Sequence, residues 1–378
     1  MTGAPAELTI RALRGIPEVR AGDDLAALLL TGVQHAGTTL AEGDLLVVSS
    51  KIASKAAGLT VAPADKADIV VAESDSVVAE RQVTAADGVS AARVTRVVRA
   101  KAGPVMAAAG VDASNTGGRD MLLLLPRDPD AVCRNLRAAL RAATGVRALG
   151  IVLSDTAGRA WRVGQTDFAL GAAGVRVLDD LRGGLDADGR PLEVTARAIA
   201  DEVAAAADLV KGKADGIPAV LVRGLGRFLT AGDAEAGADA ESDHGAGSGA
   251  RSLVRHGPGD WFALGAQEAV RAALGVDPGT ALAQAVGIRP VGRDSLAAQV
   301  DRSVGVALAT DLAGPAAVGV DVGEHRLEVT GDDPLVVGLI AARLSTALLG
   351  EGVPHEVAVD GGRVLLSLPP AAPAEPGQ

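Results

Sequence analysis

The stretch IVLSDTAGRAWRVGQTDFALGAAG, residues 151–174, decides the fold class. It continues the apolar run ALGIVL (148–153), which is short and bounded, as is typical of a buried strand. Ser154, Asp155 and Thr156 follow directly, so we expect the strand to end there. A carboxylate and two hydroxyls at the end of a buried strand are candidate ligands for a small molecule or a cation.

The flanking sequence alternates strands with helices. Apolar, β-branched runs predict further strands, and amphipathic runs predict helices. Asp128 as N-cap, Pro129 in the first turn and Gly145 at the end bound one of these helices. The predicted strands are 44–50, 121–125, 148–153 and 217–224, and the predicted helices are 128–145 and 195–210. We therefore predict an α+β domain with a mixed sheet.

A smaller unit is predicted towards the C-terminus. Helical patterns occupy 260–275 and 332–350, and strand patterns occupy 325–331 and 362–369. The interpretation is a first domain over 1–260, a small α+β module over 261–370 and a disordered tail over 371–378. The small, acidic segment 230–250 lacks apolar periodicity, which predicts a mobile insertion within the first domain.

Composition excludes several classes of partner. Acidic residues outnumber basic ones by 47 to 36, and aromatic residues make up 1% of the chain, so neither a basic field nor a stacking platform for nucleic acid is expected. The single cysteine, Cys133, excludes an intramolecular disulfide framework. No charge-free apolar run reaches the ~18 residues of a membrane helix, and we expect a cytoplasmic protein.

Polar residues recur at three predicted strand ends. Carboxylate and hydroxyl oxygens suit Mg²⁺ or Mn²⁺, and the neighbouring cations suit phosphate. If the ends meet at one sheet edge, these groups form a single site. The three sets are Ser50, Lys51 and Lys55; Asp112, Ser114 and Asn115; and Ser154, Asp155 and Thr156. The alternative is that they are only helix caps and solvated lysines, with Arg159 and Arg162 pairing with Asp167 or Asp179 on the surface.

Two common site types are absent from the sequence. The five histidines lie outside these segments, which argues against a Ser-His-Asp triad and a histidine-based zinc site. No G-x-x-x-x-G-K-[ST] motif occurs, so any nucleotide site is of another kind.

Five ordered motifs resemble one known family. They are GIPEV (15–19), GDLLVVSSKIASKAAG (43–58), AAAGVDASN (107–115), SDTAGRAWRVGQTDFALGAAG (154–174) and ADEVAAAADLVKGKADGIPAVLVRG (200–224). Together they are similar to the coenzyme F420:L-glutamate ligase family, in particular its actinobacterial form. The resemblance covers about residues 8–260.

The resemblance implies a GTP-dependent ligase. Members of this family join L-glutamate to the terminal carboxylate of the deazaflavin F420-0 and add further γ-linked glutamates through an acyl phosphate. Mg²⁺ or Mn²⁺ is the implied cofactor, with K⁺ as a further candidate, and a homodimer is the implied assembly. Carried over by motif, Asp112, Asp155 and Thr156 are the catalytic metal ligands, and the implied GTP contacts are Gly15, Ile16, Pro17, Glu18, Ser50, Lys55, Asn115, Lys211, Gly212 and Lys213.

Two other functions stay open at this point. One is a metal- and GTP-dependent amide ligase for another carboxylate, because no residue discussed above selects the deazaflavin. The other is a non-catalytic nucleotide-binding homologue that has the fold without turnover.

Overall fold

The computed structural model describes residues 7–62, 66–83, 93–113, 120–212, 215–230, 249–255, 265–290, 294–309, 318–323 and 325–368. The chain forms two compact units, Met1–Asp75 with Arg99–Gly259, and Ser76–Val98 with Asp260–Gln378. The second unit is therefore built from two separate pieces of sequence, a feature that no sequence pattern indicated. The expected insertion at 230–250 lies almost entirely outside the described residues.

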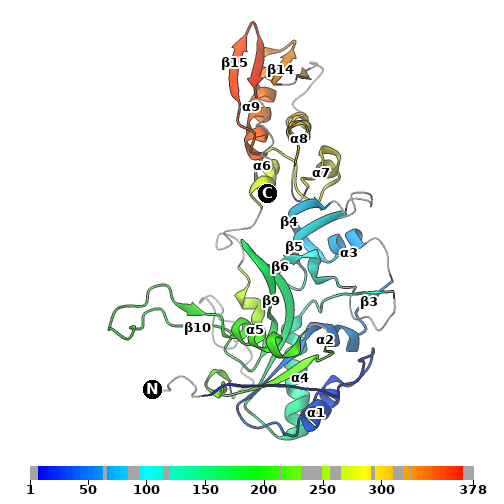
Figure 1. Cartoon of the computed structure of the whole chain (residues 1–378), viewed down its shortest axis with the longest axis vertical. Coiled ribbons are helices and arrows are strands. Elements are labelled where there is room, and N and C mark those ends of the chain that lie inside the picture. Colours follow the sequence, from blue (N-terminus) through cyan, green and yellow to red (C-terminus); the bar gives the residue numbers. More distant parts are fainter. Residues whose placement is uncertain are drawn as a thin grey trace, which may run out of the picture. The chain divides into compact units, whose positions relative to one another are not determined.

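The first unit mixes strands and helices, in agreement with the predicted α+β class (Figure 1). Its elements are β1 (Thr9–Ala12), α1 (Leu25–His35), β2 (Asp44–Ser49), α2 (Ser50–Ala56), β3 (Thr60–Val61), α3 (Lys66–Ala72), β6 (Val105–Ala107), η1 (Ala108–Gly110), β7 (Leu122–Leu123), α4 (Pro129–Thr144), β8 (Leu149–Arg159), β9 (Arg162–Ala173), β10 (Asp179–Asp180), β11 (Ala196–Arg197), α5 (Ile199–Lys211), β12 (Ala219–Arg223), η2 (Gly226–Phe228) and η3 (Ala250–Leu253). Two strands, β4 (Ser74–Val83) and β5 (Arg93–Ala100), carry the chain from this unit into the other and back.

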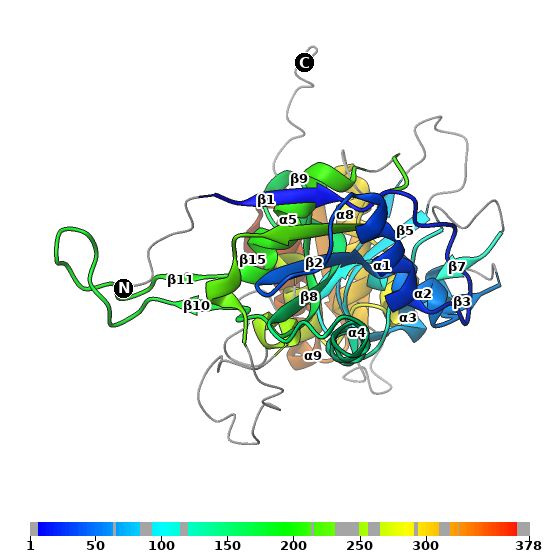
Figure 2. The same cartoon turned by 90° about the horizontal axis from the view of Figure 1, so that it is seen from below.

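A five-stranded mixed sheet positions the site. Its strand order is β1-β12-β2-β8-β9, and only β2 and β8 run parallel. Helix α5 lies along one face (Figure 2), where Val203 and Ala204 pack against Val47, Val152 and other apolar side chains of the sheet. The parallel pairing aligns Ser49 with Ser154, so β2 ends beside the polar part of β8.

The helix boundaries follow the expected chemistry. The Asp128 carboxylate accepts from the Ala131 amide at 2.9 Å and caps α4, while Gly145 adopts a left-handed conformation and ends it. The predicted strands at 44–50 and 217–224 correspond to β2 and β12, and the predicted helix at 195–210 corresponds to α5. Among the described residues, no helix is both long and apolar enough to span a membrane.

Two local expectations were wrong. Strand β8 does not end before Ser154 but continues to Arg159, because residues 155–159 still pair with β9 after the pairing with β2 has stopped at Ser154. The strand-like segment expected to end near Asp112 is the three-residue β6 followed by the single turn η1. The polar residues of β8 therefore lie within a strand, where alternation separates them onto two faces.

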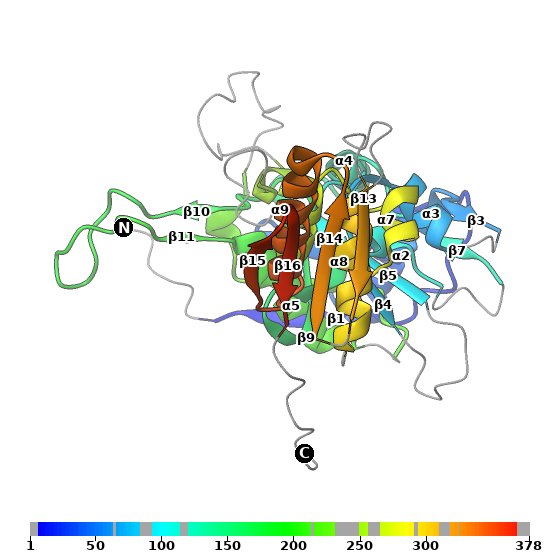
Figure 3. The ribbon, with the colours of Figure 1, turned by 90° about the horizontal axis from the view of Figure 1, so that it is seen from above.

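The second unit contains a four-stranded antiparallel sheet. Its elements after β4 and β5 are α6 (Ala266–Ala273), α7 (Ala281–Val286), α8 (Leu296–Leu308), β13 (Val318–Val322), β14 (Arg326–Gly331), α9 (Pro334–Gly350), β15 (Glu356–Asp360) and β16 (Arg363–Ser367). The strand order is β13-β14-β16-β15, and Figure 3 shows these strands side by side in front of α8 and α9. Ile340 and Leu344 of α9 pack against Leu327 and Leu366 to form its core.

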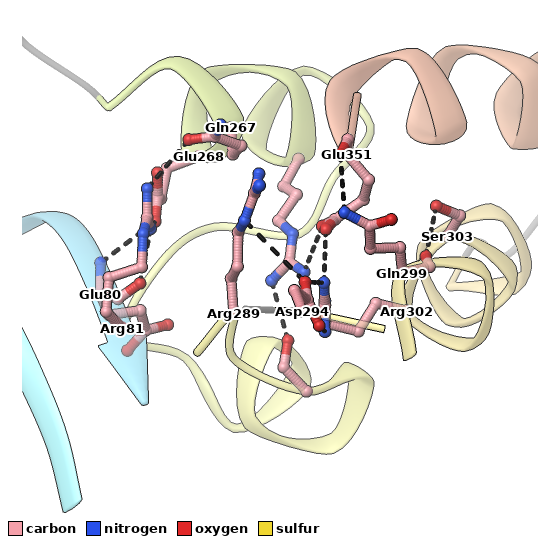
Figure 4. A network of polar contacts seen from close by, with 12 residues as sticks. Glu80, Arg81, Gln267, Glu268, Arg289, Asp294, Gln299, Arg302, Ser303 and Glu351 are labelled. Carbon is pink, nitrogen blue, oxygen red and sulfur yellow. Dashed lines mark hydrogen bonds and ion pairs between the residues drawn. The ribbon is translucent and has the colours of Figure 1, made fainter. Parts of the chain in front are cut away.

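A network of buried charges links the remaining helices of this unit (Figure 4). Glu351, which is 4% exposed, accepts from Arg271 at 2.8 Å and from Arg302 at 2.6 Å, and Arg302 also bonds Asp294. Near β4, Glu268 accepts from the backbone amide of Glu80 and from the side chain of Arg81. These contacts tie α6, α8 and β4 to the chain after α9.

Candidate functional site

Asp155 lies where β8 passes the end of β2. Helix α2 begins directly after β2, and the hydroxyl of its first residue, Ser50, donates to the Asp155 carboxylate at 3.1 Å. This contact exists because β2 and β8 are parallel neighbours, so the residue after one strand meets the polar stretch of the other. Two of the three predicted polar segments are thus brought together.

Asp112 completes the same cluster. Its backbone exchanges hydrogen bonds with Leu123 of β7, and its carboxylate forms an ion pair at 2.7 Å with Lys51, the residue after Ser50. The side chains of Lys51 and Asp112 are 25% and 36% exposed, so this part of the cluster is open to solvent. Asp112 and Asp155 therefore both contact the start of α2, so each of the three predicted sets contributes at least one described residue to this cluster.

The electrostatics of this cluster favour a cation. Burial raises the pKa of Asp155 to about 6, and the charges of Asp167 and Asp112 act in the same direction against the hydrogen bonds from Thr156 and Ser50. A buried carboxylate with a second carboxylate nearby is relieved of repulsion when a positive ion binds. Burial and charge together make Asp155 a candidate functional residue.

Thr156 belongs to a second cluster on the other face of β8. Successive strand residues point to opposite faces, and the Thr156 hydroxyl donates at 2.6 Å to Asp167, its direct partner on β9. Ser154 donates to the same carboxylate at 2.9 Å. The sequence suggested that Asp155 and Thr156 act side by side, but the strand divides them between two groups.

Lys211, a predicted GTP contact, is buried in this second cluster. It is 4% exposed, and its ammonium donates to Asp167 at 2.5 Å and to Ser154 at 2.7 Å. Burial alone raises the pKa of Asp167, but the charge and hydrogen bond of Lys211 lead to a net lowering. The alternative that Arg159 or Arg162 pairs with Asp167 on the surface is wrong, because Asp167 is 3% exposed and bonded to Lys211.

Asp167 is the residue that motif reasoning missed as part of the site. Its position could have been found from the hairpin register, since pairing Leu153 with Gly171 and allowing one bulge places Asp167 opposite Thr156.

The loop Gly15–Glu18 lies beside α2. Lys55 forms an ion pair with Glu18 at 2.5 Å, and both line a pocket of about 60 Å³ together with Arg20 and Thr60. Gly15 has φ +78, and a Cβ there would lie 2.3 Å from the His35 ring, so only glycine fits. Ile16 is half-buried and Pro17 is exposed beside it.

The remaining predicted contacts lie at the end of α5 or outside the described residues. Gly212 caps the end of α5 and has φ +63. Asn115 and Lys213 lie outside the described residues.

The carboxylates of this site form a small donor set for a divalent cation. Within the described part of the chain, no group of three or more histidine, cysteine or acidic side chains is placed to hold a metal. Mg²⁺, however, usually takes only one or two protein carboxylates and completes its shell with water and substrate phosphates. Asp155 and Asp112 supply two such carboxylates, so the residues present fit a phosphate-bound Mg²⁺ or Mn²⁺.

The fold and this site define a class of α+β proteins. Two carboxylates lie near the point where two parallel strands run side by side, and this arrangement suits phosphate chemistry. Residues 15–224 match the model of the F420-0:gamma-glutamyl ligase family. This match covers more than half of the chain, and the chain belongs to that family.

Curated relatives agree with this assignment. Three are named coenzyme F420:L-glutamate ligase. The protein of Methanothermobacter thermautotrophicus is 37% identical over 226 residues, 57% of this chain and 89% of the relative. The protein of Haloarcula marismortui is 38% identical over 250 residues, which cover 62% of this chain and 95% of the relative. The protein of Halobacterium salinarum is 39% identical over 226 residues, which cover 56% of this chain and 85% of the relative.

Proposed function

We propose that this protein joins L-glutamate to the terminal carboxylate of F420-0 and then adds further γ-linked glutamates, with GTP as the energy source. Family membership and the names of the relatives support the substrates. The observation that carries the chemistry is the convergence of Asp155, Asp112 and the start of α2 beside the Lys55–Glu18 pair.

The proposed reaction has two steps. The precursor carboxylate attacks the γ-phosphorus of GTP, the bond from phosphorus to the bridging oxygen breaks, and GDP leaves with its electron pair. The glutamate amine then attacks the acyl carbon, phosphate leaves, and the amine loses a proton to solvent. Such phosphoryl transfer depends mainly on positioning and charge neutralisation, so it needs no histidine base.

Each side chain has a role in this scheme. Asp155 and Asp112 would hold Mg²⁺ or Mn²⁺, which would neutralise phosphate charge when bound. Thr156 is a candidate ligand for a second ion, held in position by Asp167, and K⁺ is a further candidate. Lys55 would break its ion pair with Glu18 and contact phosphate instead. The hydrogen bond from Ser50 would keep the Asp155 carboxylate oriented.

We also propose a homodimer that works in the cytoplasm, where GTP is available. The segment between β10 and β11 supports the dimer, because it presents apolar side chains to solvent: Leu185 is 66% exposed and Val194 is 87% exposed. These apolar side chains would gain free energy if a second subunit covered them and removed them from water.

The test is mass spectrometry of the products formed from F420-0, L-glutamate, GTP and Mn²⁺. Successive gains of one glutamyl unit, with one GDP per unit, would support the proposal, and Asp155→Asn is the control that should form product much more slowly. GTP binding without product would instead favour another carboxylate substrate or a non-catalytic homologue.

A further inference from the structure

Lys51 is bound to one of the two carboxylates that fit a divalent cation. Its ammonium lies 2.7 Å from the Asp112 carboxylate, while the neighbouring Ser50 donates to Asp155 at 3.1 Å. The first two residues of α2 therefore contact the two carboxylates, one each. Lys51 is not among the residues that the family motifs imply for the metal or for GTP. Its position at Asp112 nevertheless affects any cation that uses this carboxylate.

An ammonium and a divalent cation compete for the same carboxylate. A lysine ammonium has three donors and no acceptor, so Lys51 cannot itself become a metal ligand. Even on separate oxygens of Asp112 the two positive charges would lie close together and repel each other. Binding of a cation to Asp112 therefore favours departure of Lys51, and the existing ion pair opposes binding of the cation.

The ion pair between Lys51 and Asp112 is weak enough to exchange. The two side chains are 25% and 36% exposed, and a pair in contact with solvent changes an equilibrium constant by roughly fivefold at most. The pair between Lys211 and Asp167 differs, because its side chains are 5% and 3% exposed and its separation would leave a buried charge. Of these two pairs, only the one at Asp112 suits an exchange of partners.

Phosphate offers Lys51 a new partner in the proposed reaction. Helix α2 holds the backbone of Lys51 next to Ser50, so a displaced ammonium stays beside the carboxylates. Lysine is a common ligand of phosphate, to which it presents a point charge. Lys55 lies one turn further along the same face of α2 and is paired with Glu18. Since Glu18 is not one of the two metal carboxylates, exchange at Lys55 leaves the metal ligands unchanged.

We propose that Lys51 is an internal counter-cation that couples metal binding to nucleotide binding. Without ligands it neutralises Asp112, and on loading it passes from Asp112 to a phosphate oxygen of GTP. One exchange then gives the carboxylate to the metal and the ammonium to the phosphate, so each ligand raises the affinity for the other. This inference rests on the proposed function, and it gives Lys51 a role in the cooperativity of binding at that same site.

Mn²⁺ binding without turnover tests the exchange. Mn²⁺ is titrated into the full chain without nucleotide, glutamate or precursor, and electron paramagnetic resonance measures the unbound ion. Lys51→Met should bind Mn²⁺ roughly two- to fivefold more tightly than the wild type, because no ammonium competes for Asp112. Lys51→Arg should bind no more tightly than the wild type, since a guanidinium also pairs with a carboxylate. Lys55→Met removes the same charge one helical turn away, and as the matched control it should change the affinity less.

The same titration with GTP gives a second readout. GTP should tighten Mn²⁺ binding more in the wild type than in Lys51→Met, and comparing the two proteins cancels the complex that Mn²⁺ and GTP form in solution. An unchanged Mn²⁺ affinity in Lys51→Met, together with weaker binding in Asp155→Asn, would overturn the inference and leave the proposed function intact. Absence of Mn²⁺ binding in both the wild type and Lys51→Met would overturn the inference together with the metal site of the proposed function.

Discussion

Asp155 is held in an environment that disfavours its charge. Burial raises its pKa to about 6, so at neutral pH the metal-free fold carries an ionised carboxylate at a free-energy cost. An isosteric amide removes that cost and also removes the anionic ligand. Function and stability therefore conflict at this residue.

We expect Asp155→Asn to lower Mn²⁺-dependent glutamylation by ~100-fold or more, because phosphate charge loses a compensating ion. The same variant should unfold at a higher temperature than the wild type at pH 8 without metal. Product formation and thermal unfolding check the two effects. Activity within a few-fold of wild type would exclude Asp155 as a ligand. The control is Ser252→Ala, which removes a hydroxyl of η3 that donates to the Gly249 carbonyl at 2.8 Å.

Lys211 and Asp167 form a buried ion pair that should stabilise the hairpin base. Lys211→Met leaves the Asp167 carboxylate buried without its cation, which typically costs about 3 to 5 kcal/mol of unfolding free energy. The double variant Lys211→Met/Asp167→Asn should recover part of the loss. Urea denaturation measures both, and a single variant as stable as wild type would mean that water or a bound ion replaces the ammonium.

Lys55 tests the nucleotide side of the site. Lys55→Ala should raise the KM for GTP more than it lowers kcat, because its ammonium would contact phosphate in the ground state. Steady-state kinetics at saturating F420-0 separate the two constants. An unchanged KM would indicate that Lys55 serves only its ion pair with Glu18.

At the scale of elements, the sequence predicted those whose signals are local. The cap at Asp128, the end at Gly145 and the apolar runs of β2 and β12 each depend on neighbouring residues. The length of β8 was not predictable from its own residues, because polar side chains at 154–159 remain in a strand only through pairing with β9. The split of Asp155 and Thr156 between two faces follows from that pairing.

The candidate site was also predictable only where the signal lay in neighbouring residues. The convergence of Ser50, Asp112 and Asp155 followed from placing polar residues where strands pass each other. The buried pairing of Lys211 with Asp167 joins residues 44 positions apart and has no local signal. Such contacts become visible only once α5 is packed on the sheet.

The charge network of α6, α8 and the segment after α9 predicts acid sensitivity. Burial alone raises the pKa of Glu351, but Arg302 and Arg271 outweigh it, so the net pKa lies below 4.5. A depressed pKa stabilises the folded state above the unfolded value, and this stabilisation is lost as pH falls through the folded pKa. The window lies below pH 4.5.

Glu351→Gln should therefore destabilise the protein at pH 7, and the difference from wild type should shrink as pH falls below 4.5. Thermal unfolding of both proteins, followed from pH 7 to below pH 4.5, measures this difference in stability. Glu328→Gln is the control, because Glu328 pairs with Arg326 and Arg363 on the face of β14 opposite the buried Leu327 and Val329, where solvent screens the charges. A difference for Glu351→Gln that does not change with pH would contradict this account.

At the scale of the whole molecule, the two pieces of the second unit depend on each other. Glu80 and Arg81 of β4 are bonded to Glu268 of α6. Ending the chain at Gly259 would leave Ser76–Val98 without these partners, and we expect a less stable and more aggregation-prone protein. Light scattering would measure the aggregation, and urea denaturation would measure the loss of stability. A truncated chain as stable as the full one would mean that the first unit alone is enough to stabilise β4 and β5.

The divided second unit also sets an order of events during synthesis. Roughly 160 residues separate Val98 from Asp260, and a ribosome adding about 5–20 residues each second needs on the order of 10 to 30 seconds to make them. During that interval β4 and β5 have emerged while α6, α8 and α9 have not. The nascent chain must keep these strands from pairing with a neighbour, so the yield of native protein should depend on translation speed across this interval.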